Sequence, residues 1–191
     1  MSLHAGSRAV ERFPNHSDNL NLIVKNVISD PEWWIKNEKK FENPDVVSVL
    51  VHGDMWSPQF LWKNDDLLSL VDWQQAHIGS LTEDLLHVLS LCISVEMKER
   101  VTVPLLRYYY NQLTAAMKAK NTEVPFTFDY LQQDYRDSLP LTACFAIIAI
   151  SMWSNSPVLR SGTSDDEERV AEAGRRMLAT LNHCVKECGW S

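Results

Sequence analysis

The stretch LVHGDMWSPQFLWKNDDLLSLVDWQ, residues 50–74, contains the features that decide the fold. It begins at the end of a β-branched run that is too short for a helix and that predicts a buried strand. Turn residues at 64–66 separate two further apolar runs, as in a β-hairpin. The sequence therefore predicts a small β segment over residues 46–73, with strands at 46–51, 59–63 and 67–73.

Helical spacing of apolar residues precedes this segment, over residues 18–41. Asp30 followed by Pro31 predicts a fresh helix start inside that range, because Asp is a favoured N-cap and Pro suits the first helical position. The first sixteen residues show no such periodicity, and we expect residues 1–16 to be irregular.

Residues 81–189 are also predicted to be helical. The patterns Ser80–Glu83 and Ser164–Glu167 have the S-x-x-E form of a capping box, and Gly189 stands where a glycine would end the last helix. A further helix is expected over 128–153. The fold class is therefore α+β and mainly helical, without the alternation of strands and helices that builds a parallel sheet.

The amino-acid composition argues against several classes of protein. Acidic side chains outnumber basic ones by 25 to 18, which disfavours nucleic acid and an anionic membrane surface as partners. The longest apolar run, residues 143–153, is about half of the roughly 20 residues that a spanning helix needs. Four cysteines in 191 residues do not make a disulfide scaffold. We expect a cytoplasmic protein.

The segment also contains polar residues at a spacing that suits phosphoryl transfer. His52 precedes Asp54 by two residues, Gln59 follows Asp54 by five, and Asp72 ends an apolar strand. Transfer from ATP needs one carboxylate to accept the hydroxyl proton, and a carboxylate with an amide oxygen to hold Mg²⁺. Kinases take these groups from a loop H-x-D-x-x-x-x-N and from an Asp after the next hairpin.

Gly53 in the middle of the loop, with Trp56 after it, resembles the small-molecule branch of the protein-kinase-like fold. The stretch is similar to the choline kinase-like family (the ecdysteroid kinase-like or CHK kinase-like family), a relative of the aminoglycoside phosphotransferases. The similarity covers roughly residues 46–153 and extends loosely to the last helix. It implies that residues 17–191 form the C-terminal lobe of that fold.

The resemblance implies a role for each site residue. Asp54 would be the catalytic base, Asp72 and Gln59 would hold the metal, and His52 and Asp84 would stabilise the loop. The implied reaction transfers the γ-phosphoryl group of ATP to a small-molecule hydroxyl substrate, with Mg²⁺ and ATP as cofactors. Neither nucleic acid nor a membrane is an expected partner.

Two features depart from the family pattern. Gln59 replaces the usual Asn, and its extra methylene moves the amide oxygen by about 1.5 Å, although Mg²⁺ demands near-ideal geometry. The residues before Val46 contain no glycine-rich G-x-G-x-x-G loop and no strand lysine. We therefore expect the N-terminal lobe to be missing from this chain, which would be inactive alone.

Other interpretations remain open. The chain could be a non-catalytic kinase-like remnant that binds a small molecule or regulates a relative, and a metal-dependent hydrolase is a distant third. Asp54 and Asp72 could also be turn carboxylates without chemistry. His77 and His87 are expected to be ordinary histidines. Cys184 and Cys188 are expected to be small apolar residues on a buried helix stripe rather than zinc ligands.

Overall fold

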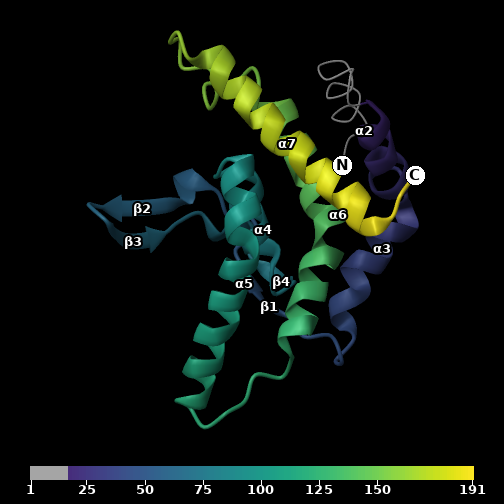
Figure 1. Cartoon of the computed structure of the whole chain (residues 1–191), viewed down its shortest axis with the longest axis vertical. Helices are drawn as coiled ribbons and strands as arrows, with labels where there is room; N and C mark the ends of the chain where they lie inside the picture. Colours follow the sequence, from purple (N-terminus) through teal and green to yellow (C-terminus); the bar gives the residue numbers. More distant parts are fainter. Residues whose placement is uncertain (1–16) are drawn as a thin grey trace. The chain divides into compact units, whose positions relative to one another are not determined.

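The computed structural model describes residues 17–191, so the expectation for residues 1–16 lies outside the described residues. The chain divides into two compact units, one containing residues 17–40 and 139–191 and the other Phe41–Ser138. The described chain is mainly helical with a few short antiparallel strands, which confirms the predicted α+β class. Figure 1 labels the elements, and its labels are used below.

The first unit begins with three consecutive helical segments. They are α2 (Ser17–Ile23), the π-helix η2 (Val24–Ile28) and α3 (Pro31–Lys39), followed by a short 3₁₀ turn, η3 (Lys40–Glu42), at the border of the two units. The predicted restart is confirmed, because the Asp30 carboxylate accepts the backbone N–H groups of Glu32 and Trp33. The helical range ends close to its predicted limit at residue 41.

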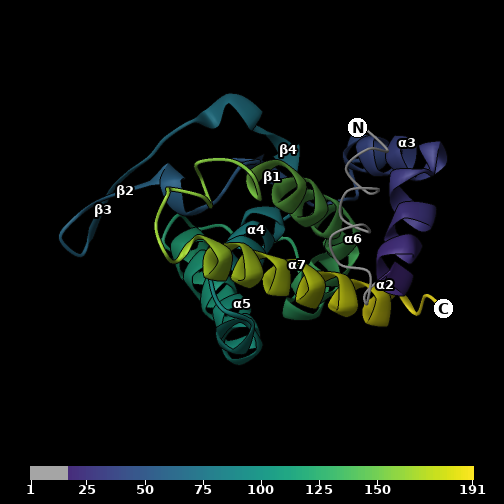
Figure 2. The ribbon, with the colours of Figure 1, turned by 90° about the horizontal axis from the view of Figure 1, so that it is seen from above.

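The last helix, α7 (Asp166–Cys188), lies beside α2 within this unit (Figure 2). Asn19 donates a hydrogen bond to Asn182 at 2.8 Å. Gly189 ends α7 in the left-handed conformation that was predicted for it. Of the two cysteines predicted for a buried stripe of this helix, Cys184 is buried, whereas Cys188 is only partly buried. The other buried apolar side chains of α7 are Val170, Met177, Leu181 and Val185.

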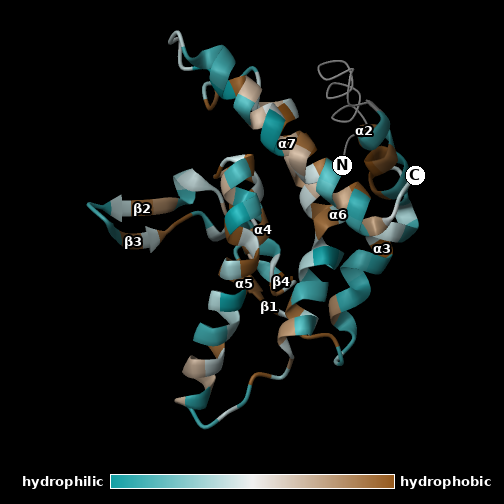
Figure 3. Cartoon of the chain, viewed as in Figure 1, coloured by the Kyte–Doolittle hydropathy of each residue, from teal (hydrophilic) through white to brown (hydrophobic). Residues whose placement is uncertain are grey.

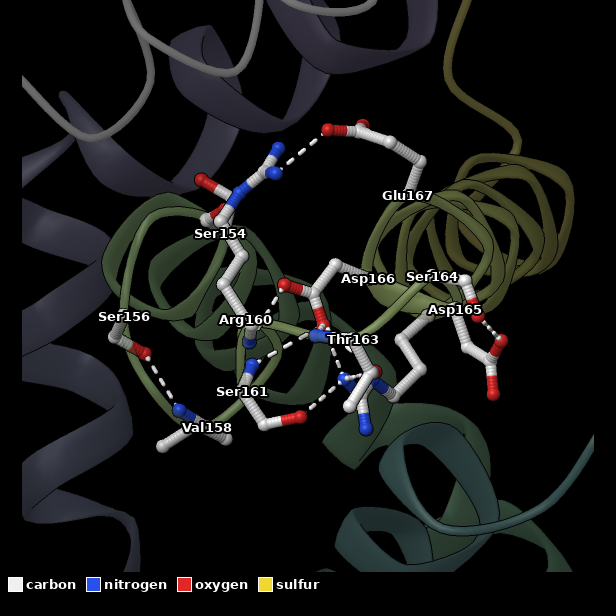
Figure 4. Close-up of polar contacts among 12 residues, drawn as sticks. Ser154, Ser156, Val158, Arg160, Ser161, Thr163, Ser164, Asp165, Asp166 and Glu167 are labelled. Atoms are coloured by element: carbon white, nitrogen blue, oxygen red, sulfur yellow. Dashed lines mark hydrogen bonds and ion pairs between the residues drawn. The ribbon is translucent and has the colours of Figure 1, made fainter.

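The capping box predicted at the start of α7 is wrong. The Ser164 hydroxyl donates to the neighbouring Asp165 carboxylate instead of capping the helix. Asp166 organises the connection in its place, since its carboxylate accepts the backbone N–H groups of residues 161–163 and pairs with Arg169 (Figure 4). Burial works to raise the pKa of Asp166, but these hydrogen bonds lower it to about 2.

The second unit contains all the strands that the structure describes, arranged as two separate antiparallel pairs. The predicted hairpin is confirmed as β2 (Phe60–Lys63) paired with β3 (Asp66–Leu70). The first predicted strand shortens to β1 (Val49–Val51), which pairs with β4 (His77–Gly79). The sequence pattern missed β4, because three residues are too few to show an alternation.

Three helices complete the second unit, the last of which continues into the first unit. They are α4 (Glu83–Leu91), α5 (Val95–Lys118) and α6 (Phe128–Trp153), and the bounds of α6 coincide with the prediction. The apolar run after residue 85 divides into two helices because Ser94 caps a new one, its hydroxyl accepting the Met97 N–H. Among the described residues, no helix is long and apolar enough to cross a membrane.

The core of the second unit lies where β1 and the three helices contribute apolar side chains. Leu86, Leu89 and Leu106 are buried there together with Val51 and Leu131. The loop after β1 therefore starts from a buried strand, while the β2–β3 hairpin projects away from α4 and α5 (Figures 1 and 2). The loop with His52 and Asp54 therefore extends from a strand that the core holds in place.

Candidate functional site

The loop after β1 is held by a carboxylate from the first turn of α4. The Asp84 carboxylate accepts the backbone N–H of His52 at 2.8 Å and that of Gly53 at 3.0 Å. Each oxygen takes one bond, so the side chain clamps two successive peptide groups. Hydrogen bonds to a charged acceptor are stronger than neutral ones, and a clamp of this kind fixes the loop against α4.

Gly53 is required at the bend of this loop. Its φ is +81°, in the region that side chains disfavour, and a Cβ atom built there would lie 2.5 Å from the carbonyl oxygen of Gln75. Any other residue would therefore push the loop away from the segment after β3. The sequence difference that suggested the small-molecule branch, glycine at this position, thus has a steric reason in this chain.

The side chain of His52 is buried and connects the loop with the chain at the end of β3. Its Nε2 lies 2.8 Å from the Val71 carbonyl oxygen, and its Nδ1 accepts the Asp54 N–H at 3.3 Å. A carbonyl can only accept and an N–H can only donate, so Nε2 is the donor and Nδ1 the acceptor of the ring. The ring also packs against Trp73, with centroids 4.7 Å apart. Both nitrogens are occupied by backbone, so the ring positions the loop.

Asp54 and Gln59 are in direct contact. The Gln59 amide nitrogen donates to the Asp54 carboxylate at 2.9 Å, and Gln59 is buried in the 3₁₀ turn η4 (Ser57–Gln59). Because a carboxylate accepts, the nitrogen end of the amide must face it. The amide oxygen of Gln59 is then directed away from Asp54 and stays available as an acceptor or metal ligand.

Asp72 does not end a strand, as the sequence suggested, but follows β3 in the left-handed conformation with φ +64°. Its neighbour Val71 donates its N–H to the Gln59 carbonyl at 3.1 Å and accepts from His52 through its own carbonyl. The backbone leading to Asp72 is therefore tied to both His52 and Gln59. A non-glycine residue with positive φ is uncommon, and such strain is concentrated at functional sites.

Four of the five residues that the sequence singled out are thus linked by one set of hydrogen bonds, and the fifth, Asp72, follows next in the chain. Asp84 binds the loop of His52, the loop leads to Asp54, Asp54 binds Gln59, and Val71 joins both sides immediately before Asp72. In residues 17–191, no three His, Cys, Asp or Glu side chains gather as a metal site of their own. A magnesium ion carried by phosphates needs only one or two protein carboxylates, so the donor set of Asp72 and Gln59 fits such an ion.

Two histidines lie near this network. His77 in β4 is exposed and pairs with the buried Glu83 at 3.3 Å; burial raises the pKa of Glu83, and the His77 charge works against that rise. His87 in α4 is buried, and its pKa is lowered by burial, with the charges of Asp84 and Asp54 acting in the opposite direction. His77 is thus a surface histidine and His87 a buried one.

A second buried polar cluster was missed by sequence reasoning. The predicted capping box at Ser80–Glu83 forms only in part: the Glu83 carboxylate accepts the Ser80 N–H, but the Ser80 hydroxyl donates to Asp134 in α6 at 2.6 Å. Thr82 donates both its N–H and its hydroxyl to the same Asp134 oxygen. These partners are more than fifty residues apart in sequence, and no local spacing signals such a contact.

The chain is similar to known proteins over a range that includes these residues. The family described as "Uncharacterized oxidoreductase dhs-27" (DUF1679) matches residues 35–184, a range that contains the whole candidate site. The chain is 25% identical over 150 residues to the Caenorhabditis elegans protein of that name, covering 66% of this chain and 18% of the relative. It is 27% identical over 153 residues to an "Uncharacterized kinase-like protein" of Caenorhabditis elegans, covering 76% of this chain and 40% of the relative.

The chain therefore spans less than half the length of either curated relative. No solved structure matches it.

Proposed function

The chain belongs to the family described as "Uncharacterized oxidoreductase dhs-27", and from that premise and its similarity to a kinase-like protein we propose that it is the C-terminal lobe of a small-molecule kinase. The proposed lobe has the protein-kinase-like fold, and the proposed reaction moves the γ-phosphoryl group of ATP to a hydroxyl group. The observation that carries the proposal is the hydrogen-bonded set that joins His52, Asp54, Gln59 and Asp84 and leads directly to Asp72.

In this proposal each residue has a role that its surroundings support. Asp54, partly exposed and oriented by the Gln59 amide, accepts the proton of the substrate hydroxyl. Asp72 and the oxygen of Gln59 hold the metal that accompanies the phosphates. Magnesium ATP supplies the phosphoryl group and neutralises charge as the group transfers. His52 and Asp84 keep the loop in place.

The finer assignment to the choline kinase-like family rests on Gly53 and Trp56. Gly53 occupies a bend in which a side chain would collide with the Gln75 backbone. A protein-kinase loop carries an arginine at this point, and the present geometry has no space for one. The proposed acceptor is therefore a small molecule, and its identity is left open.

The word oxidoreductase in the family description comes from the longer Caenorhabditis elegans protein, of which this chain covers 18%. Dinucleotide-binding folds are built from parallel strands joined by crossover helices. Both strand pairs in the described part of the chain are antiparallel. The described residues thus give the phosphotransferase proposal more support than a dehydrogenase one.

A non-catalytic, kinase-like binding or regulatory protein is the second candidate. It is favoured by Gln59 at the position where the resembled family has Asn. In that case the same hydrogen bonds would support a folded scaffold without transfer. The two candidates differ in whether Asp72 and Gln59 bind a metal–nucleotide complex.

Paramagnetic broadening separates these candidates, because it detects weak binding. Mn²⁺ with ATP is added to the ¹⁵N-labelled chain in place of Mg²⁺, and the amide signals are followed by NMR. We expect selective broadening at residues 54, 59 and 72 that is lost in Asp72→Ala. The matched control is Asp66→Ala, which removes an exposed carboxylate from the nearby hairpin and should leave the broadening unchanged.

Uniform broadening of all acidic surface segments, or the same pattern in Asp72→Ala, would count against the kinase proposal and favour the non-catalytic one.

A further inference from the structure

A buried carboxylate in α6 organises the segment that leads into α4. Asp134 is 4% exposed, and one of its oxygens accepts from the Ser80 hydroxyl at 2.6 Å, the Thr82 hydroxyl at 2.9 Å and the Thr82 N–H at 3.1 Å. Ser138, one turn along α6, lies 2.7 Å from the same Ser80 hydroxyl. Burying a carboxylate is costly unless it is well hydrogen-bonded, so this cluster is a specific arrangement.

The start of α4 does not have the usual N-terminal capping hydrogen bond. Thr82 is the N-cap residue of α4, yet its side chain makes no capping hydrogen bond. Its hydroxyl is turned toward Asp134 and donates to it. Ser80 and Glu83 match a capping box in sequence, and Ser80 also turns to Asp134. Both hydroxyls donate to a carboxylate on another helix, and the Ser80 oxygen also accepts the Thr82 N–H. The orientation of the start of α4 is thus set by α6.

The start of α4 carries Asp84, two residues after Thr82. Asp84 clamps the N–H groups of His52 and Gly53, and a helix turn transmits a shift at Thr82 directly to it. We propose that Asp134 is a positioning residue for the loop of Asp54, acting through Thr82 and Asp84. The importance of this role rests on the proposed function, but the positioning itself is measured without nucleotide.

Hydrogen exchange at the clamped amides tests the proposal. In the 191-residue chain, native-state exchange of the His52 and Gly53 amides is compared with that of the Leu106 amide in the middle of α5. We expect Asp134→Ala to speed exchange at His52 and Gly53 by at least about tenfold relative to Leu106, the factor for loss of a hydrogen bond to a charged group. A purely structural role would speed all three amides alike.

Two milder variants keep the test decisive if Asp134→Ala does not fold. Thr82→Val keeps the shape of the side chain but removes the hydroxyl, and it should give the same selective effect at a smaller size. Asp134→Asn retains one accepting oxygen and should be intermediate. The matched control Asp137→Asn alters an exposed carboxylate one turn along α6 and should change nothing.

A double variant links the two carboxylates. If Asp134 acts through Asp84, then adding Asp134→Asn to Asp84→Asn should speed exchange at Gly53 no further. Additive effects of the two substitutions, or equal changes at Gly53 and Leu106 in Thr82→Val, would overturn the proposal. Failure of nucleotide binding would leave this result untouched, so the two proposals fail separately.

Discussion

The carboxylate of Asp84 accepts the backbone N–H of Gly53 at 3.0 Å, although 31 residues separate the two in sequence. The other oxygen of the same carboxylate accepts the neighbouring His52 N–H. This clamp connects the start of α4 to the bend that carries Asp54, and it is the contact through which the candidate site depends on the helices.

Removing the clamp should destabilise the protein. Asp84→Ala deletes two charge-assisted hydrogen bonds to partly buried amides, for which we expect a loss of about 2–4 kcal/mol in the free energy of unfolding. Urea unfolding followed by circular dichroism measures it. Asp129→Ala, an exposed first-turn carboxylate of α6, is the control. A loss below about 0.5 kcal/mol would show that the clamp contributes little.

Gly53 and Gly162 form a natural pair for testing the loop bend. Both have φ near +80°, but a Cβ at Gly53 meets the Gln75 backbone at 2.5 Å, whereas a Cβ at Gly162 meets nothing within 4 Å. Gly162→Ala should cost only the conformational term, about 1–2 kcal/mol. Gly53→Ala should cost clearly more, because backbone must move as well. Thermal unfolding compares them, and equal losses would contradict the steric argument.

Lys98 should make stability depend on pH in the alkaline range. Burial lowers the pKa of Lys98 from 10.5 to about 8, and its Nζ donates to Ser90. Because the folded pKa lies below the unfolded one, the unfolded chain binds more protons between about pH 8 and pH 10.5, so this group makes stability rise with pH there.

Lys98→Met should remove that rise and stabilise the protein at pH 7 by at most about 3 kcal/mol. Lys118→Met, at an exposed position of the same helix, is the control. Urea unfolding from pH 7 to pH 10 measures the difference between each variant and the unmodified chain. A parallel pH profile for Lys98→Met would contradict the prediction.

The β2–β3 hairpin should promote self-association of this chain. Both strands contain hydrophobic residues (Figure 3). Among them, Trp62 is 58% exposed and Leu68 is 62% exposed. An apolar ribbon with open edges favours contact with other chains. We expect light scattering to show association that grows with concentration and that decreases in Leu68→Lys. Tyr108→Lys, an equally exposed position in α5, should not reduce it. If light scattering shows only monomer at high concentration, the prediction that this surface promotes association is wrong.

Much of the secondary structure could be predicted because its signals are local. Asp30 marks a helix start because its side chain binds N–H groups two and three residues later, and Pro31 suits the first helical position. Gly189 marks a helix end because its backbone adopts the left-handed conformation. The strands were predicted less accurately. The strand expected to end at Trp73 stops at Leu70, and Asp72 then takes a left-handed conformation. Short strands and turns depend on their partners, so their limits are hard to read from one segment.

The sequence by itself determined the mainly helical α+β class, the hairpin and the four polar residues at kinase-like spacing, because short-range periodicity and spacing are properties of the chain itself. Only the tertiary structure decided where the hydroxyls of Ser80 and Thr82 point. Each hydroxyl donates there to a buried carboxylate, which lies 54 residues from Ser80 and 52 residues from Thr82. The position of this carboxylate is known only once α6 has packed against the start of α4, so no local pattern predicts these bonds.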